Sequence, residues 1–136
     1  LGCAQLENLS PYIGEKLRIA AGYADALAGI PGITPMPAIP GVDGTYWLYT
    51  VLVDAARFGM DSRQLLRQLQ EQGIQSRPLW QPLHLSQPHR DCQFLGGGVT
   101  DRLYADGLSL PCSVDLSPDD QARVVRAIAR AAGQAA

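Results

Sequence analysis

The sequence is poor in the residue types that mark secreted, metal-binding and membrane proteins. Its three cysteines, Cys3, Cys92 and Cys112, are widely spaced and form no CxxC pair. This pattern predicts neither a disulfide framework nor a zinc site, and it fits a reducing environment. The chain also lacks the run of about twenty apolar residues that a membrane span needs, and no basic segment leads into an apolar one near its start. We therefore expect a soluble, cytoplasmic protein without a membrane partner.

Long runs of one charge are missing as well. Eleven basic and thirteen acidic residues are scattered along 136 positions and give a net charge of −2. No basic stretch could follow a nucleic-acid backbone, so a nucleic-acid partner is not expected. With 46% hydrophobic and 18% charged residues, the composition is that of a globular protein of a size that fits one core.

The apolar residues that are present form helical and extended patterns. Residues 5 to 28 carry them at spacings of three and four, which predicts a helix that Ser10 and Pro11 cap and restart and that Gly29 ends. The predicted inner face of this helix consists of Leu6, Leu9, Tyr12, Ile13, Leu17, Ala20, Ala21, Ala24 and Leu27. Residues 29–44 hold four prolines among glycines and small apolar residues, and they predict an extended connector.

Three strands and further helices follow in the remaining sequence. The apolar, β-branched and aromatic segment 45–53 predicts a central strand, and Asp61 and Gln64 predict a capping box before a helix that Gly73 ends. Residues 73–80 predict an edge strand, 81–98 a long loop, 99–106 a short helix, 107–112 a third strand and 117–133 a last helix. A three-stranded sheet packed by about four helices makes the fold class α/β, arranged in two layers.

The segment "RPLWQPLHLSQPHRDC", residues 77–92, concentrates three prolines, two arginines, one tryptophan and both histidines. His84 and His89 are five residues apart, which is outside the spacing of two metal ligands on one helical turn, so no metal is expected. From the sequence alone, a surface or hydrogen-bonded loop position is the favoured interpretation of either histidine. The prolines restrict the backbone around His84, however, and thereby lower the entropy that this side chain loses on binding a ligand.

Arg77 and Trp80 each have a functional and an ordinary interpretation. Arg77 suits a phosphate or carboxylate, but an arginine near an edge strand is more often a solvated surface charge. Trp80 and Trp47 suit core or rim packing, with stacking on a flat ligand as the alternative. Gly96–Gly98 resembles a phosphate loop only weakly, because the chain has neither GxGxxG nor GxxxxGK[ST], and a flexible turn is the simpler interpretation. No catalytic residue is identified.

The order of four segments carries a family resemblance over nearly the whole chain. They read "AQLENLSPYIGEKLRIAAGYADAL", "YWLYTVLV", "LLRQLQEQGIQSRPLWQPLH" and "GLSLPCSVDLSPDDQARVVRAI". Together they resemble the C-terminal part of the DegT-type sugar aminotransferases, which are pyridoxal-phosphate enzymes of the aspartate aminotransferase fold. The resemblance implies a mainly antiparallel small-domain sheet at residues 29–136, preceded at 1–28 by a helix that links it to an absent large domain.

The resemblance also implies a reaction. The most similar enzymes aminate C4 of a UDP-linked 4-keto-2-acetamido-6-deoxysugar, with glutamate as amino donor and pyridoxal phosphate as cofactor, and family members are usually homodimers. The cofactor lysine belongs to the large domain, and Lys16, the only lysine here, is expected on the polar side of the first helix. We therefore expect an inactive fragment that does not itself bind the cofactor. A non-catalytic sugar-nucleotide-binding or regulatory module, and a purely structural fragment, stay open as alternatives.

The resemblance assigns substrate-binding roles within one segment. His84 matches the family histidine beside the sugar-nucleotide site, and Arg77 and Trp80 belong to the same stretch. After His84 the family often continues with glutamine, proline and an aromatic residue. This chain has an extra Ser86 and places His89 where that ring would stand. The sugar contact at this point is therefore open.

Overall fold

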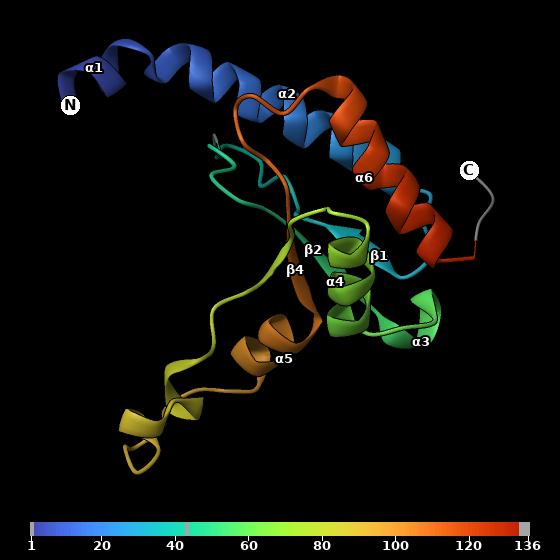
Figure 1. The fold of residues 1–136 in the computed structure, drawn as a ribbon. Coiled ribbons are helices and arrows are strands. Elements are labelled where there is room, and N and C mark those ends of the chain that lie inside the picture. The colour runs from blue at the N-terminus through green and yellow to red at the C-terminus, as the bar shows by residue number, and fades with distance from the viewer. Residues whose placement is uncertain (1, 43, 134–136) are drawn as a thin grey trace.

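A four-stranded antiparallel sheet lies at the centre of the computed structural model, which describes residues 2–42 and 44–133. The strands follow the spatial order β1-β2-β4-β3 (Figure 1). Their register places Ile33 opposite Val53, Tyr49 opposite Leu110, and Arg77 opposite Ser109. The strand bounds are β1 Ile33–Pro35, β2 Tyr49–Val53, β3 Arg77–Pro78 and β4 Gly107–Leu110.

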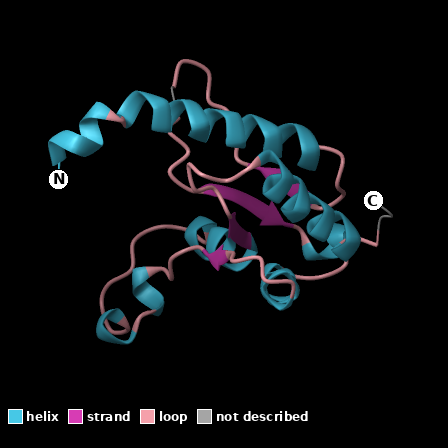
Figure 2. Cartoon of the chain, turned by 45° about the horizontal axis from the view of Figure 1, so that its top comes forward, coloured by secondary structure: helices cyan, strands magenta, loops and turns pink. Residues whose placement is uncertain are grey.

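Among the described residues, six α-helices and two short 3-10 helices connect and cover these strands (Figure 2). None of the helices in the described part of the chain is long and apolar enough to cross a membrane. The helices are α1 Gly2–Glu7, α2 Leu9–Leu27, α3 Ala55–Phe58, α4 Ser62–Glu71, η1 Leu83–Leu85, η2 Gln87–His89, α5 Val99–Asp106 and α6 Pro118–Ala131.

One face of the sheet is closed by α2, α4 and α6. Because side chains alternate along a strand, Tyr49, Val51 and Val53 of β2 all point to this face, and all three are buried. They pack with residues of the three helices in a single cluster that includes Tyr23, Leu27, Leu65, Leu69, Leu108, Leu110, Val124 and Ile128. The hydrophobic core of the molecule is therefore on this side, which we call the helix-covered face.

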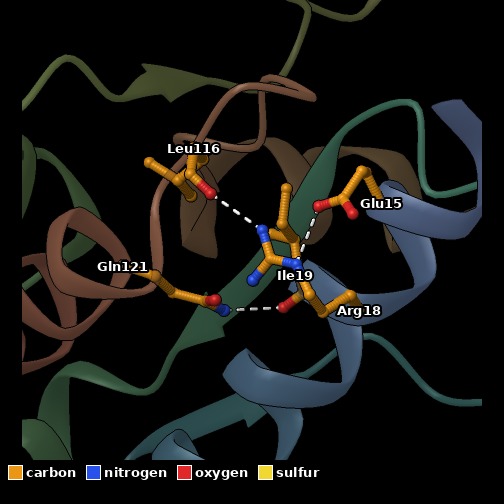
Figure 3. Close-up of polar contacts among 5 residues, drawn as sticks. All are labelled: Glu15, Arg18, Ile19, Leu116 and Gln121. Atoms are coloured by element: carbon orange, nitrogen blue, oxygen red, sulfur yellow. Dashed lines mark hydrogen bonds and ion pairs between the residues drawn. The ribbon is translucent and has the colours of Figure 1, made fainter.

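Polar contacts lock α2 onto α6 at the edge of the core. The buried Gln121 side chain donates from Nε2 to the carbonyl oxygen of Ile19 at 2.7 Å (Figure 3). Beside it, Arg18 donates to the carbonyl oxygen of Leu116 and pairs with Glu15, both at 2.8 Å. A buried amide that finds a backbone partner avoids the cost of desolvation, so this contact fixes the position of α6 along α2.

The predicted helix signals of the C-terminal half are present in the structure. Asp61 and Gln64 form the reciprocal capping box that starts α4, and Gly73 follows its end with a φ of 71°. Ser117 caps α6 through the amide of Asp120, with Pro118 at the first helical position. Helix α5 occupies residues 99–106, as the sequence predicted.

The fold class is confirmed, and the sheet has one strand more than the sequence predicted. The extra strand is β1, a three-residue edge strand within the proline-rich connector, and its Pro35 ends the pairing. An edge strand tolerates proline because one side of its backbone has no ladder partner. The other strands are shorter than predicted, and α3, which Asp54 caps, was not predicted.

The first helix departs from its predicted boundaries and inner face. Helix α2 begins after Asn8 and runs through Ser10 and Pro11, so these two residues do not restart it. Its buried residues are Ile19, Ala20, Tyr23 and Leu27, whereas Leu6, Leu9, Tyr12 and Leu17 are exposed and Ala21 and Ala24 are not buried. The predicted stripe was wrong at the leucines and Tyr12 because only the C-terminal half of α2 lies against the sheet (Figure 1). Ala21 and Ala24 lie within that half but off the stripe that Ile19, Ala20, Tyr23 and Leu27 form, so they face away from the core.

The segment 79–98, which we call the arm, extends away from this body between β3 and α5 (Figures 1 and 2). Helix α5, which follows the arm, is anchored to α4. Arg63 of α4 donates to the carbonyl oxygen of Tyr104 at 2.8 Å, and its guanidinium lies 4.7 Å from the centre of the Tyr104 ring. The hydroxyl of Ser62 bonds to the carbonyl oxygen of Ala105. These contacts fix α5, and thereby the C-terminal root of the arm.

Candidate functional site

A cleft of about 540 Å³ opens beside the edge strand β3, at the root of the arm. Residues from both ends of the chain meet there, because the N-terminal helix α2 passes the end of β4. Its lining contains two basic side chains and no acidic one among the described residues, so we call it the cationic cleft. It is lined by Lys16, Trp47, Leu48, Gln75, Arg77, Pro78, Leu79, Trp80, Ser109, Leu110, Pro111, Cys112 and Ser113.

Lys16 lies in this cleft and not on the polar side of α2, where the sequence interpretation placed it. Its Nζ donates to the carbonyl oxygens of Cys112 and Trp47, the latter at 3.1 Å, and lies 3.7 Å from Sγ of Cys112. A signal for this placement was present in the sequence. Lys16 precedes Ile19, Ala20 and Tyr23 by three, four and seven residues, so it belongs to the buried stripe of the helix.

Arg77 and Trp80 stand on the same cleft. Arg77 is exposed on β3, and its guanidinium has no hydrogen bond or ion pair among the described residues. Trp80 stacks on Trp47 with ring centres 6.0 Å apart and planes at 20°, yet the two residues are 69% and 70% exposed. A free guanidinium suits phosphate or carboxylate oxygens, and the exposed ring pair suits the apolar face of a flat ligand.

The same tryptophan pair borders a second, apolar groove of about 760 Å³. This groove lies on the face of the sheet opposite the core, where Thr50 and Leu52 point, and α5 closes one side with Leu103. We call this side the open face. Its other lining residues come mainly from the proline-rich connector and include Met36, Ile39, Val42 and Tyr46.

His84 lies elsewhere, on the arm, and is not part of the cationic cleft. It is the central residue of η1, where its Nε2 lies 2.8 Å from Oδ1 of Asp101 in α5 and its ring centre lies 4.3 Å from that of Phe94. The side chain is only 22% exposed. His89 is instead exposed in η2, and its Nδ1 lies 3.0 Å from the hydroxyl of Ser86. The extra Ser86 therefore contacts His89 within the arm.

The structure thus brings together two of the three predicted substrate-binding residues. Arg77 and Trp80 line one cleft, whereas His84 is held against α5 on the arm. Sequence reasoning missed Lys16, Asp101 and Phe94. Asp101 gave no signal, because its approach to His84 depends on the path of the intervening arm.

Two tyrosines behind the cleft stay uncharged. Burial, followed by the proximity of Cys112 and Tyr49, raises the pKa of Tyr23 far above its usual value, and its hydroxyl donates to the carbonyl oxygen of Pro111 at 2.8 Å. Burial, followed by the proximity of Tyr46 and Asp25, raises the pKa of Tyr49 to about 12. The two rings stack at 5.1 Å. The positive charge of the cleft therefore comes from Lys16 and Arg77 without a compensating phenolate behind them.

The described residues do not assemble a metal site. No group of three histidine, cysteine, aspartate or glutamate side chains within the described ranges could hold a metal ion. All three cysteines are free thiols, and Cys112 is the buried one.

Known proteins resemble this chain over almost all of its length. The sequence profile of the DegT/DnrJ/EryC1/StrS aminotransferase family matches residues 1–129. EpsN of Bacillus subtilis (strain 168), whose name places it among pyridoxal phosphate-dependent aminotransferases, is 31% identical over 94% of this chain and 33% of its own length. GDP-perosamine synthase of Caulobacter vibrioides is 28% identical over 94% of this chain and 34% of its own length.

Solved structures of other proteins share the fold of this chain. The structure of DesI with its TDP-sugar product matches 97% of this chain and 34% of its own, with a TM-score of 0.87 and 27% identity. DesV of S. venezuelae, solved with a ketimine intermediate, matches 98% of this chain and 35% of its own, with a TM-score of 0.82 and 26% identity. The chain spans about a third of the length of the relatives that it matches.

Proposed function

Because the chain belongs to the DegT/DnrJ/EryC1/StrS aminotransferase family, we propose that it is the small C-terminal domain of a pyridoxal-phosphate-dependent sugar aminotransferase. The observation that carries this proposal is the family match over residues 1–129, together with relatives that are about three times as long. A third of such a protein contributes one part of a shared site, and the remaining parts come from the rest of the polypeptide.

We further propose that the substrate is a UDP-linked 4-keto-2-acetamido-6-deoxysugar and that glutamate donates the amino group. The relatives support a nucleotide sugar, since one is named GDP-perosamine synthase and another was solved with a TDP-sugar product. The cationic cleft supports an anionic ligand, because Arg77 and Lys16 face it without a carboxylate among its lining residues. Trp80 offers an apolar surface beside these cations, and the prolines of the arm hold the backbone that presents His84.

The residues of this chain do not fit the attachment of pyridoxal phosphate. That cofactor needs a lysine for its Schiff base, and it supplies the electron sink for amino transfer. The only lysine here is Lys16, whose ammonium group is engaged by the carbonyl oxygens of Cys112 and Trp47. The cofactor lysine therefore belongs to the rest of the polypeptide, and the present chain binds and orients substrate only.

A homodimer and a cytoplasmic location complete the proposal. The three cysteines are free thiols, which fits a reducing compartment. The exposed residues Leu6 of α1 and Leu9 and Leu17 of α2 offer an apolar surface to the rest of the polypeptide or to a second copy.

A second candidate function is a sugar-nucleotide-binding module without catalysis. The observation that favours it is that Lys16, Arg77, Trp47 and Trp80 form the cationic cleft entirely within this chain. Both tryptophans are exposed at the cleft, so their fluorescence reports binding. Quenching by a UDP-N-acetylhexosamine in this chain alone, with no gain on extending the polypeptide, would favour the module.

The decisive experiment compares this chain with a longer polypeptide that also carries the two thirds present in the relatives. Each is mixed with pyridoxal phosphate, and the absorbance of bound cofactor and the glutamate-dependent amination of a UDP-4-ketosugar are measured. We expect both signals only in the longer polypeptide. A longer polypeptide that binds the cofactor but leaves the ketosugar unchanged would contradict the substrate assignment, and one that binds no cofactor would contradict the enzyme.

A further inference from the structure

His84 on the arm makes two side-chain contacts in the described part of the chain, one with Asp101 of α5 and one with the ring of Phe94. Nε2 of His84 lies 2.8 Å from Oδ1 of Asp101. The Phe94 ring lies against the imidazole with centres 4.3 Å apart and planes at 40°. A carboxylate oxygen close to one ring nitrogen and an aromatic ring against the imidazole together restrict the torsions of this histidine side chain.

The oxygen involved needs a donor. Oδ1 of Asp101 is buried from solvent and has no hydrogen bond among the described residues, although Nε2 of His84 lies 2.8 Å away. A buried carboxylate oxygen without a donor is costly, so the nearest N–H in reach is strongly favoured to point at it. Among the described residues, Nε2 of His84 is the group at that distance.

We propose that Asp101 is a positioning residue for His84, which it holds in the tautomer protonated on Nε2. In a neutral imidazole one nitrogen donates and the other accepts, so this tautomer leaves Nδ1 as an acceptor. Nδ1 has no hydrogen bond in the described part of the chain. His84 therefore offers an acceptor to a hydroxyl or ammonium group of the substrate. The identity of that substrate rests on the proposed function, whereas the tautomer of His84 rests only on its contact with Asp101.

The chain provides a control within itself. His89 lies five residues away on the same arm, and its Nδ1 contacts the hydroxyl of Ser86, not a carboxylate. A substitution of Asp101 changes the partner of His84 and leaves that of His89 in place. Asp101 also stands in the first turn of α5, where a negative charge stabilises the helix. The variant T100D/D101A restores a carboxylate to that turn at a position one residue away.

The test is a long-range ¹H–¹⁵N correlation spectrum of this chain at pH about 9, above the ordinary histidine pKa of about 6.5. This spectrum separates protonated from unprotonated ring nitrogens. We expect His84 to show one tautomer, with the proton on Nε2, and to become a mixture in both D101A and T100D/D101A. His89 is expected to keep its wild-type spectrum in both variants.

Three results would overturn the proposal: a mixture at His84 in the wild type, an unchanged single tautomer in D101A, or a single tautomer in T100D/D101A. The last would mean that Asp101 acts only through the stability of α5. If D101A also alters His89, the arm itself has rearranged, and T100D/D101A with a wild-type His89 spectrum decides the question.

Turnover tests the positioning role. In the longer polypeptide that aminates the UDP-4-ketosugar, D101A and H84A should each lower kcat/KM about 10- to 100-fold, and the double variant should be no slower than H84A. A wild-type kcat/KM in D101A would contradict positioning. If the longer polypeptide has no activity at all, the proposed function fails, while the spectrum still decides the pairing of Asp101 with His84.

Discussion

The helix-covered face and the arm use apolar residues in opposite ways. On the helix-covered face, Leu65, Leu69 and Ile128 are fully buried and pack in one cluster with the sheet. On the arm, Leu83, Leu95 and Phe94 are large apolar residues that are 71%, 82% and 49% exposed. The comparison separates the part of the chain that stabilises the fold from the part that is left free to meet another surface or a ligand.

The side-chain hydrogen bonds also differ between the two regions, because those of the body span long stretches of sequence and those of the arm are local. Gln121 reaches Ile19 and Tyr23 reaches Pro111 across 102 and 88 residues of sequence. On the arm, Gln81 bonds to Leu85 four residues away and Ser86 to Leu83 three residues away. These short-range bonds shape the arm, and the contact of His84 with Asp101 is its one long-range polar side-chain contact among the described residues, so the arm belongs to the low-stability end of the molecule.

The largest contrast should come from removing one leucine on each side. Leu69→Ala leaves a cavity in the core and should lower the free energy of unfolding by about 2–5 kcal/mol, whereas Leu95→Ala removes an exposed side chain and should change it by less than about 0.5 kcal/mol. Urea denaturation of the two variants measures the difference. Equal losses would mean that the arm is packed as tightly as the core.

Two glycines provide the next contrast. A Cβ at Gly107, at the start of β4, would overlap the side chain of Leu79 and the carbonyl oxygen of Leu103, whereas a Cβ at Gly97 on the arm meets nothing within 4 Å. Gly107→Ala should therefore cost about 1–3 kcal/mol and Gly97→Ala almost nothing. Thermal unfolding compares them. A stable Gly107→Ala variant would show that Leu79 and the root of the arm can move away from the sheet.

The stacked tyrosines give a smaller contrast inside the core. Tyr23→Phe removes the donor to the carbonyl oxygen of Pro111 and should cost about 1 kcal/mol. Tyr49→Phe removes a buried hydroxyl that has no partner among the described residues, so it should be neutral or stabilising. A clear loss of stability in Tyr49→Phe, measured in urea, would reveal a partner for that hydroxyl.

Alkaline pH should produce the smallest of these effects. The folded-state pKa values of Tyr23 and Tyr49 are raised, the latter to about 12, so the folded state retains protons that the unfolded state loses. Stability from these groups is fully present below a pH of about 10, the ordinary tyrosine pKa, and is lost as the pH rises through the folded-state values. The decline in unfolding temperature above pH 10 should be shallower in Tyr49→Phe. An identical decline would assign the effect to other groups.

The sequence predicted α4, α5 and α6 well because local signals determine these helices. The capping box at Asp61, the Ser117 cap and the extent of α5 are short-range features, and they appear where they were predicted. The short strand β1 escaped prediction because its pairing with β2 depends on a contact across the proline-rich connector.

The candidate site was less accessible to sequence reasoning. Arg77 and Trp80 were identified, and they share one cleft because β3 lies beside β4. Lys16 was assigned to solvent, although its spacing to Ile19 and Tyr23 placed it on the buried stripe. The approach of Asp101 to His84 depends on the path by which the arm leads back to α5. The hydrophobic periodicity of the sequence does not predict the path of a loop.

The account assigns stability to the helix-covered face and ligand binding to the cationic cleft at the root of the arm. The most direct test of this division uses Arg77→Ala and Trp80→Ala in the longer polypeptide. Both residues are exposed, so the unfolding temperature should stay close to that of the wild type, with at most a small loss from the tryptophan stack. We predict that kcat/KM for the UDP-4-ketosugar falls at least about tenfold in each variant. Wild-type turnover in both variants would contradict the account, because the cationic cleft would then have no part in binding the substrate.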